Sequence, residues 1–406
     1  MAELHLLSPA GFRAAGVSAG IKSKRGALDV GLLAGDALAT AAAVFTTNKV
    51  FAAPVKIGRK HVARGKLRGV VVNAGNANAC TGSRGERDAI QMCSLTARAI
   101  GCKTDEILPS STGIIGHFLP MQKLARGIGD ASRELGASRE HALRFADAIL
   151  TTDTKRKSAS TRVKIRRDFV TIAGVCKGSG MIGPRMSATL HATMLAYLTT
   201  DAKFASSAGL TRLLQIATDR SFNAVTVDDH TSTNDTAAIF ASGATGVAID
   251  ARSSNGARFL DALVEVCQSL AYQIAADGEG ATKVVTIHVH GAKSVMDAQT
   301  IARAIANSPL VKCAMHGNDP NWGRIVSAAG LCGAAFDPDR CELKIQGAAV
   351  FRRGRPLAFN ATTISRSLAA KEVVVDLACN IGDANATVWT CDLSKDYVTI
   401  NADYHT

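Results

Sequence analysis

The sequence predicts an α/β protein of layered sheets and helices, with a large first lobe and a smaller C-terminal lobe. Apolar strand-like runs alternate with amphipathic helical segments throughout, and the loops between them are short. No low-complexity linker interrupts the pattern, and 406 residues can bury a large core. From residue 283 the pattern changes to short strands around one helix, so we place the lobe boundary near 280. The expected lobes are therefore 1–280 and 281–406.

In the first lobe, strand and helix patterns follow one another in chain order. The apolar run from Leu67 to Val72 predicts a buried strand that ends in a polar turn at 73–76. Ser138 is placed as the N-cap of a helix that ends in the polar loop Thr151-Thr152-Asp153. Apolar residues at helical spacing predict four amphipathic helices, over 86–100, 138–150, 206–221 and 258–275.

The C-terminal lobe is expected to hold mainly short strands. A strand at 284–287 precedes a helix at 295–306, and further short runs follow at 340–346, 371–377 and 385–390. We expect a final strand over 397–401 that returns to the functional site. The mixture of elements supports α/β layers in this lobe too.

The net charge of +13 is distributed unevenly along the chain. Up to Ala192 there are 29 Lys and Arg against 13 Asp and Glu, and after it 18 against 21. Such a basic half would suit a nucleic-acid-binding protein, which is the alternative from another class. Only 5% of the residues are aromatic, however, and no known nucleic-acid-binding signature appears. The densest run, 155–167, alternates with Val163 and Ile165, which is typical of a solvated hairpin strand turning at Asp168.

Composition also bears on metals, cofactors and cellular location. The 10 cysteines are scattered singly, so a disulfide framework or a zinc site is not expected. His288 and His290 have the only metal-like spacing, and without a third ligand we interpret them as exposed strand residues. No apolar run is long enough to cross a bilayer, and the first residues do not have the pattern of a signal peptide. The expected location is the cytoplasm.

The segment with the strongest chemical pattern is a glycine-rich turn that leads to a threonine. Lys177-Gly178-Ser179-Gly180-Met181-Ile182-Gly183-Pro184 precedes Ala192-Thr193. A threonine hydroxyl inside a chain is a poor nucleophile, because it has no attached base. If the bond before Thr193 is cleaved, the new α-amine, with a pKa of about 8, can act as that base. From these residues alone, a threonine at the start of a buried helix remains the simpler interpretation.

The order of several motifs changes that interpretation. They include Val72–Gly82 (Val-Asn-Ala-Gly-Asn-Ala-Asn-Ala-Cys-Thr-Gly), Ser110–Gly116, the turn at 177–182, Thr231–Thr236, Asp277–Lys283, Asp319–Arg324 and Ile400–Tyr404. Each is weak alone, but together and in this order they resemble the ornithine acetyltransferase (glutamate N-acetyltransferase) family of arginine biosynthesis. The resemblance runs the length of the chain.

The resemblance implies a fold, a reaction and a quaternary structure. The core would be two sheets sandwiched between helices. The chain would cut itself between Ala192 and Thr193 into 1–192 and 193–406, and the pieces would form an α₂β₂ heterotetramer. Thr193 would take acetyl from N2-acetylornithine and pass it to glutamate, with no cofactor and no nucleic-acid or membrane partner. Whether acetyl-CoA is also a donor stays open, and the alternative enzyme is an N-terminal-nucleophile amidohydrolase or aminopeptidase.

The resemblance also assigns residues to roles in the site. Thr112 and Gly113 would stabilise the oxyanion through a hydroxyl and a backbone N–H, as such donors do in acyl transfer. Substrate contacts would come from Lys177, Thr193 and one threonine of the pair Thr151 and Thr152, which the sequence does not separate. The remaining substrate contacts would come from Glu279, Asn401 and Thr406.

The segment before the proposed nucleophile departs from the family pattern. Residues 187–191 (Ser-Ala-Thr-Leu-His) are extra, and Thr189 and Thr193 look like copies four residues apart. Spacing from Lys177 suits Thr189, whereas the spacing of the residues after the site, including the interval to Glu279, suits Thr193. We therefore expect Thr193 to be the nucleophile, and the insertion raises the question of how efficiently the chain is cleaved.

Overall fold

A computed structural model describes residues 3–186 and 194–403 of the chain. The described residues form two compact units, one made of 3–186, 194–223 and 231–270 and the other of 224–230 and 271–403. The passage from one to the other falls inside helix α6 (Ser254–Ala276). None of the helices in the described residues is both long enough and apolar enough to span a membrane.

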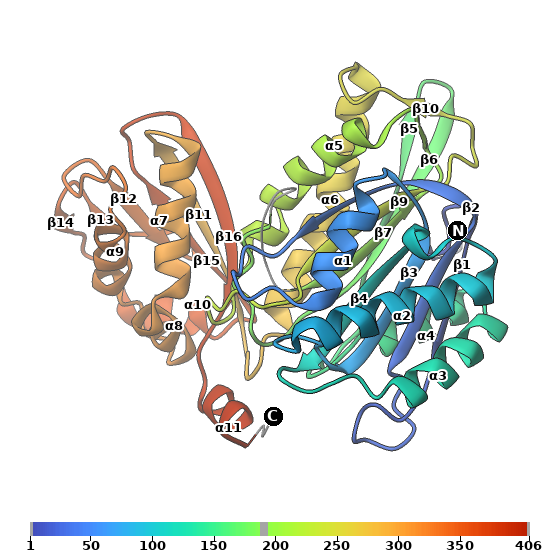
Figure 1. Cartoon of the computed structure of the whole chain (residues 1–406). Coiled ribbons are helices and arrows are strands. Elements are labelled where there is room, and N and C mark those ends of the chain that lie inside the picture. The colour runs from blue at the N-terminus through green and yellow to red at the C-terminus, as the bar shows by residue number, and fades with distance from the viewer. Residues whose placement is uncertain (1–2, 187–193, 404–406) are drawn as a thin grey trace. The chain divides into compact units, whose positions relative to one another are not determined.

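The first unit is built on an eight-stranded mixed sheet (Figure 1). Its strand order is β4-β3-β2-β9-β7-β6-β5, and β1 pairs with β2. The strands are β1 (Phe12–Val17), β2 (Val30–Phe45), β3 (Lys66–Asn76), β4 (Ile107–Ile114), β5 (Lys157–Ile165), β6 (Asp168–Lys177), β7 (Leu195–Thr200) and β9 (Thr236–Ala241). A separate short ladder joins β8 (Lys203–Phe204) and β10 (Ala248–Ile249).

Strand β2 is the centre of this sheet and changes partners along its length. Its first part, from Val30 to Ala34, lies between β1 and β3, and its last part, from Thr40 to Phe45, pairs with β9. The ladder with β3 is irregular between Ala34 and Ala39, where the strand adjusts its register. Strand β2 thus connects β1, β3 and β4 to β9, β7, β6 and β5 in one continuous sheet.

Helices cover the sheet of the first unit on both faces. They are α1 (Ala53–Val62), α2 (Gly82–Ile100), α3 (Met121–Arg133), α4 (Arg139–Ala148), α5 (Ser207–Asp219) and the first part of α6, with the short 3-10 helices η1 (Thr104–Glu106) and η2 (Phe222–Ala224). Leu32 of β2 packs in a core with Met92 of α2, whereas Leu33 packs in a separate core with Phe145 of α4. Because successive residues of a strand point to opposite faces, the sheet has a core on each side.

The second unit has a six-stranded mixed sheet of its own (Figure 1). Its strand order is β14-β13-β12-β15-β11-β16. The strands are β11 (Val284–Ala292), β12 (Glu342–Ile345), β13 (Ala348–Arg352), β14 (Arg355–Pro356), β15 (Glu372–Ala378) and β16 (Ala384–Cys391), and the helices are α7 (Val295–Asn307), α8 (Pro309–His316), α9 (Trp322–Leu331), α10 (Ala361–Leu368) and α11 (Lys395–Asp403). Ile287 and Val375 of the sheet pack against Ile301 of α7 in one core. His288 and His290 lie on the other face of β11, stacked with ring centroids 5.9 Å apart. His290 is exposed as expected, whereas His288 is half-buried.

The structure confirms the α/β class and most of the elements predicted from apolar spacing. The predicted helices correspond to α2, α4, α5, α6 and α7, and the basic hairpin to β5 and β6, with Ile165 paired to Asp168 across the turn. Ser138 is at the N-cap of α4, but its hydroxyl lies 2.6 Å from His141 Nδ1 and makes no capping bond to the backbone. The polar turn predicted at 73–76 is instead the last part of β3.

The strand predicted at 397–401 is wrong, because these residues lie in helix α11. Their β-branched and aromatic side chains favour a strand only where a neighbouring strand is present to pack against. Here Val398 is 64% exposed, and no ladder includes this segment. The hydroxyl of Ser394 accepts a hydrogen bond from the backbone N–H of Asp396 (3.2 Å), a local contact that favours the start of a helix.

Candidate active site

The predicted oxyanion residues lie at the end of strand β4, where it runs parallel to β3. Gly113 is opposite Gly75 in this ladder and has a φ of +128°, a conformation that L side chains rarely adopt. A Cβ on Gly113 would lie 2.4 Å from the carbonyl carbon of Gly75. Only glycine therefore allows β3 and β4 to approach this closely and to place Thr112 beside β3.

Lys177 lies at the end of β6, and the structure brings it to Thr112. The Lys177 ammonium donates a hydrogen bond of 3.3 Å to Thr112 Oγ1, and both residues are buried. An ammonium group has no acceptor, so the Thr112 oxygen accepts here and keeps its own hydrogen for another partner. A predicted substrate-binding residue and a predicted oxyanion residue are thus in direct contact.

A buried carboxylate, Asp153, connects the other predicted residues of this unit. Its side chain is 0% exposed, and its Oδ1 accepts hydrogen bonds from Lys157 Nζ (2.7 Å) and from the backbone N–H of Gly178 (2.6 Å). Its Oδ2 accepts a hydrogen bond from the backbone N–H of Thr151 (3.1 Å). Burial alone would raise the pKa of Asp153, but Lys177, Lys157 and the Gly178 N–H outweigh it and lower this pKa to about 2. Asp153 is therefore ionised at neutral pH.

The pKa of Asp235, directly before β9, is shifted in the opposite direction. It is fully buried, and among the residues that the structure describes neither of its carboxyl oxygens has a hydrogen-bond partner. Burial raises the pKa of Asp235 well above its ordinary value, although the positive charge of Lys177 opposes the shift. Lys177 thus lies in the field of two buried carboxyl groups with pKa values shifted in opposite directions, an arrangement common at functional sites.

Polar side chains also tie the start of β9 to the ends of β3 and β4. The amide of Asn234 donates hydrogen bonds to the carbonyl oxygens of Ala77 (2.6 Å) and Ser111 (2.9 Å). The hydroxyl of Ser111 donates to Asn73 Oδ1 (2.6 Å). All three side chains are buried, so these bonds fix the backbone next to Thr112.

The proposed cleavage segment itself lies outside the described residues. Thr193, Ala192 and the alternative Thr189 belong to 187–193, and Thr406 also lies outside. The residues on either side of the segment are placed. Met194 is buried, and its carbonyl oxygen accepts a hydrogen bond from the N–H of Thr236 (2.7 Å). Leu195, the first residue of β7, pairs with Lys177 on one side and Thr236 on the other.

The second unit brings together two of the other predicted residues. Glu279 is half-buried in the loop after α6, and its Oε2 accepts a hydrogen bond of 3.0 Å from Asn401 Nδ2. Gly280 makes this contact feasible, since a Cβ there would lie 2.4 Å from the backbone nitrogen of Tyr397 in α11. Glu279 and Asn401 are therefore neighbours, although Asn401 lies on a helix rather than on a strand.

Sequence reasoning missed Asp153, Lys157 and Asp235. Thr151-Thr152-Asp153 has the composition of an ordinary polar loop, and the predicted loop is confirmed. The basic run 155–167 is expected to be solvated, yet the side chain of Lys157 is only 1% exposed. A carboxylate four residues before a lysine was the available signal for a buried pair, while Asp235 gave no signal beyond its place in the Thr231–Thr236 motif.

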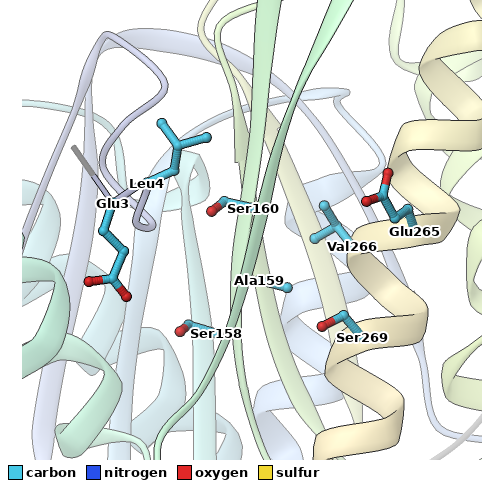
Figure 2. Close-up of a pocket in the computed structure, with 8 residues that line it drawn as sticks. All are labelled: Glu3, Leu4, Ser158, Ala159, Ser160, Glu265, Val266 and Ser269. Atoms are coloured by element: carbon cyan, nitrogen blue, oxygen red, sulfur yellow. The ribbon is translucent and has the colours of Figure 1, made fainter. Parts of the chain in front are cut away.

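The structure also contains a pocket away from these residues (Figure 2). It has a volume of about 430 Å³ and is lined by Glu3, Leu4, Ser158, Ala159, Ser160, Glu265, Val266 and Ser269. Figure 2 shows Ala159 of β5 on the side of Val266 and Ser269 of α6, whereas Ser158 and Ser160 point to the side of Glu3 and Leu4. None of the predicted site residues that the structure describes lines this pocket, so the candidate site rests on the cluster around Lys177.

Comparison with known proteins agrees with the motif order. The model of the ArgJ family matches residues 13–406. The chain is 46% identical to the arginine biosynthesis bifunctional protein ArgJ of Symbiobacterium thermophilum, over 98% of each protein. It is 48% identical to the protein of the same name from Geobacter sulfurreducens, over 98% of this chain and 99% of that protein. The crystal structure of arginine biosynthesis bifunctional protein ArgJ from Bacillus halodurans has 37% identity and a TM-score of 0.51, over 52% of this chain and 100% of that chain. The resemblance found in the sequence is therefore confirmed, and the chain belongs to the ArgJ family.

Proposed function

We propose that this chain transfers the acetyl group of N2-acetylornithine to glutamate through an acetyl-threonine intermediate. As a member of the ArgJ family it is an acyltransferase of arginine biosynthesis. The observation that carries the proposal is the 46–48% identity over nearly the whole length to two proteins named for that role. It favours this enzyme over a nucleic-acid-binding protein, which the basic first half alone would suit.

In the proposal, Thr193 is the nucleophile and becomes the first residue of a second chain after cleavage at Ala192. The hydroxyl attacks the acetyl carbonyl, and the α-amine of the same residue takes the proton. The negative charge on the carbonyl oxygen is stabilised by the Thr112 hydroxyl and the Gly113 N–H. The contact from Lys177 supports this role, because it leaves the Thr112 hydrogen to donate elsewhere. One such donor contributes about 3 kcal/mol to transition-state binding.

The two substrates share an amino-acid carboxylate, and in the proposal Lys177 binds it. Glu279 and Asn401 act on the substrate side chain, where the Glu279 carboxylate attracts the second amine of ornithine. The remaining proposed contacts are Thr406 and one threonine of the pair Thr151 and Thr152. No cofactor takes part, since the acyl group passes directly from substrate to threonine to substrate.

Two features support cleavage into chains that stay together. The Bacillus halodurans chain is matched over its full length yet corresponds to 52% of this one, and 193–406 is also just over half of the chain. In the sheet, β9 and β7 come from 193–406, and they lie between β2 and β6 from 1–192. Strands of one piece would therefore be hydrogen-bonded on both sides to the other. We propose that two such pairs form an α₂β₂ heterotetramer.

We also propose a cytoplasmic location. None of the ten cysteines forms a disulfide bond within the residues that the structure describes, which suits a reducing compartment.

Intact mass spectrometry tests the reaction directly. Purified protein incubated with N2-acetylornithine should gain one acetyl group on the 193–406 chain, and glutamate should then remove it and yield N-acetylglutamate. Loss of the acetyl group to water without glutamate would identify the amidohydrolase alternative. A parallel incubation with acetyl-CoA in place of N2-acetylornithine tests whether acetyl-CoA is a second acetyl donor. If neither donor labels the protein, the covalent mechanism is wrong.

A further inference from the structure

We propose that Asp153 is a positioning residue. It holds the loop at Thr151 and the turn at Gly178, the two substrate-binding segments of the first unit, in a fixed relative position. The inference rests on the proposed function, because that function makes Lys177 and one threonine of the Thr151–Thr152 pair substrate contacts. One carboxylate accepts hydrogen bonds from the N–H of Thr151 and from the N–H of Gly178, the residue after Lys177. Asp153 lies 25 residues before Gly178, so two segments that are distant in the chain share a single anchor.

The anchor is rigid because the carboxylate is buried and fully paired. Its side chain is 0% exposed, and Lys157 Nζ, 1% exposed, lies 2.7 Å from Oδ1. An ionised group in such surroundings is stable only when several donors replace water, and here three donors do so. Any shift of the Thr151 loop or of the Gly178 turn would break one of these bonds, so the two segments keep one relative placement.

The anchor also sets the charge next to Lys177. Lys157 and Asp153 form a neutral pair, and the positive charge of Lys177 then gives the three-residue cluster a net positive charge. A carboxylate is the substrate group that such a cluster favours, and both amino-acid substrates carry one. The Asp153 anchor should therefore affect the binding of both substrates to a similar extent.

The first test replaces the carboxylate with an amide in the full-length chain. Asp153→Asn should raise KM for N2-acetylornithine and for glutamate by about tenfold each, as expected when a hydrogen bond to a charged group is weakened. kcat should fall less than kcat/KM. The matched control is Asp147→Asn, which breaks a solvent-exposed pair with Arg156 and should leave KM unchanged.

A second measurement does not depend on catalysis. Hydrogen–deuterium exchange should become faster at the amides of Thr151 and Gly178 in Asp153→Asn and stay at the wild-type rate in Asp147→Asn. If wild-type protein transfers no acetyl group, the proposed function fails, but this exchange experiment still decides the role of Asp153. Unchanged exchange at both amides in a folded variant would overturn the positioning role.

A double variant separates positioning from simple charge balance, and it serves if Asp153→Asn alone does not fold. Asp153→Asn combined with Lys157→Met removes both charges of the buried pair and leaves no unpaired lysine. If Asp153 is only the counter-ion of Lys157, the double variant should recover wild-type KM and amide protection, and the proposal is wrong. If Asp153 positions the two segments, both defects should persist.

Discussion

Asn401, on helix α11, donates a hydrogen bond of 3.0 Å to the carboxylate of Glu279 in the loop that follows α6. The bond fixes one carboxylate oxygen of Glu279. The Asn401 amide also donates to the carbonyl oxygen of Tyr397 (3.0 Å), so the amide is itself held in place. A carboxylate oriented in this way is suited to bind an ammonium group, because a neutral amide leaves its negative charge intact.

We expect Glu279→Gln to separate the two substrates. Loss of the negative charge should raise KM for N2-acetylornithine by a factor corresponding to about 1.5–3 kcal/mol, while KM for glutamate changes little. Lys177→Met should instead raise KM for both substrates. Steady-state kinetics with each substrate varied in turn checks both variants, and equal small changes on both substrates would exclude Glu279 from the site.

Cleavage should depend on one threonine of the duplicated pair. Thr193→Ala should leave one uncut chain without transfer activity, whereas Thr193→Ser, which keeps a hydroxyl, should retain part of both. Thr189→Ala is the matched control, since it alters the other copy and should still yield 1–192 and 193–406. Intact mass and N-terminal sequencing identify the products, and a new terminus at residue 189 in wild-type protein would show that Thr193 is the wrong choice.

Gly113→Ala should destabilise the end of the β3–β4 ladder. The added Cβ would lie 2.4 Å from the backbone of Gly75, so one of the two strands must move, at a cost of about 1–3 kcal/mol in the free energy of unfolding. Gly116→Ala is a matched control, because Gly116 also has a positive φ but no atom within 4 Å of a Cβ. Urea denaturation of both variants measures the difference, and equal losses would show that the contact with Gly75 is not the cause.

The buried carboxyl group of Asp235 should make stability depend on pH. Its pKa is raised in the folded state, so the folded protein keeps a proton that the unfolded chain releases above about pH 4. Its contribution to stability is therefore full below pH 4 and is lost as pH rises, by up to about 1.4 kcal/mol per pH unit until the folded group ionises.

Asp235→Asn removes this titration and should flatten the fall in stability between acidic and neutral pH. Asp153 has the opposite sign, because its folded pKa is lowered to about 2, and its contribution disappears only as pH falls below about 4. Urea midpoints across pH 4–8 for wild type and variant check the prediction. Parallel profiles would mean that Asp235 keeps an ordinary pKa.

Most helices and strands could be predicted from the sequence, because the spacing of apolar residues reflects which face of an element is buried. The sequence could not predict that Lys177 contacts Thr112, since that contact depends on how β4 and β6 are placed within one sheet. Motif resemblance named both residues without placing them. The helix over Lys395–Asp403 was missed because Tyr397, Val398 and Ile400 have strand-forming side chains, while the outcome depended on the absence of a strand partner.

Charged residues were the hardest to interpret from sequence. Lys157 follows Lys155 and Arg156, and nothing in that basic run distinguishes the one buried lysine from its solvated neighbours. Lys157 is buried against Asp153, which also accepts a hydrogen bond from Gly178, far along the chain. Asp235 could not be recognised from the sequence for the same reason. Its burial without a hydrogen-bond partner among the described residues depends on which residues surround it in space.

The placement of β9 and β7 between β2 and β6 affects how the protein can fold before and after the proposed cleavage. A precursor can reach this strand order in a unimolecular reaction, because every strand belongs to one polymer. After the proposed cleavage, the same strand order can form only when two separate chains meet, because β9 and β7 belong to one chain and β2 and β6 to the other. Denatured mature protein should then regain its structure with a yield that depends on concentration, whereas the uncut Thr193→Ala chain should not. The covalent link would matter during assembly and be dispensable afterwards.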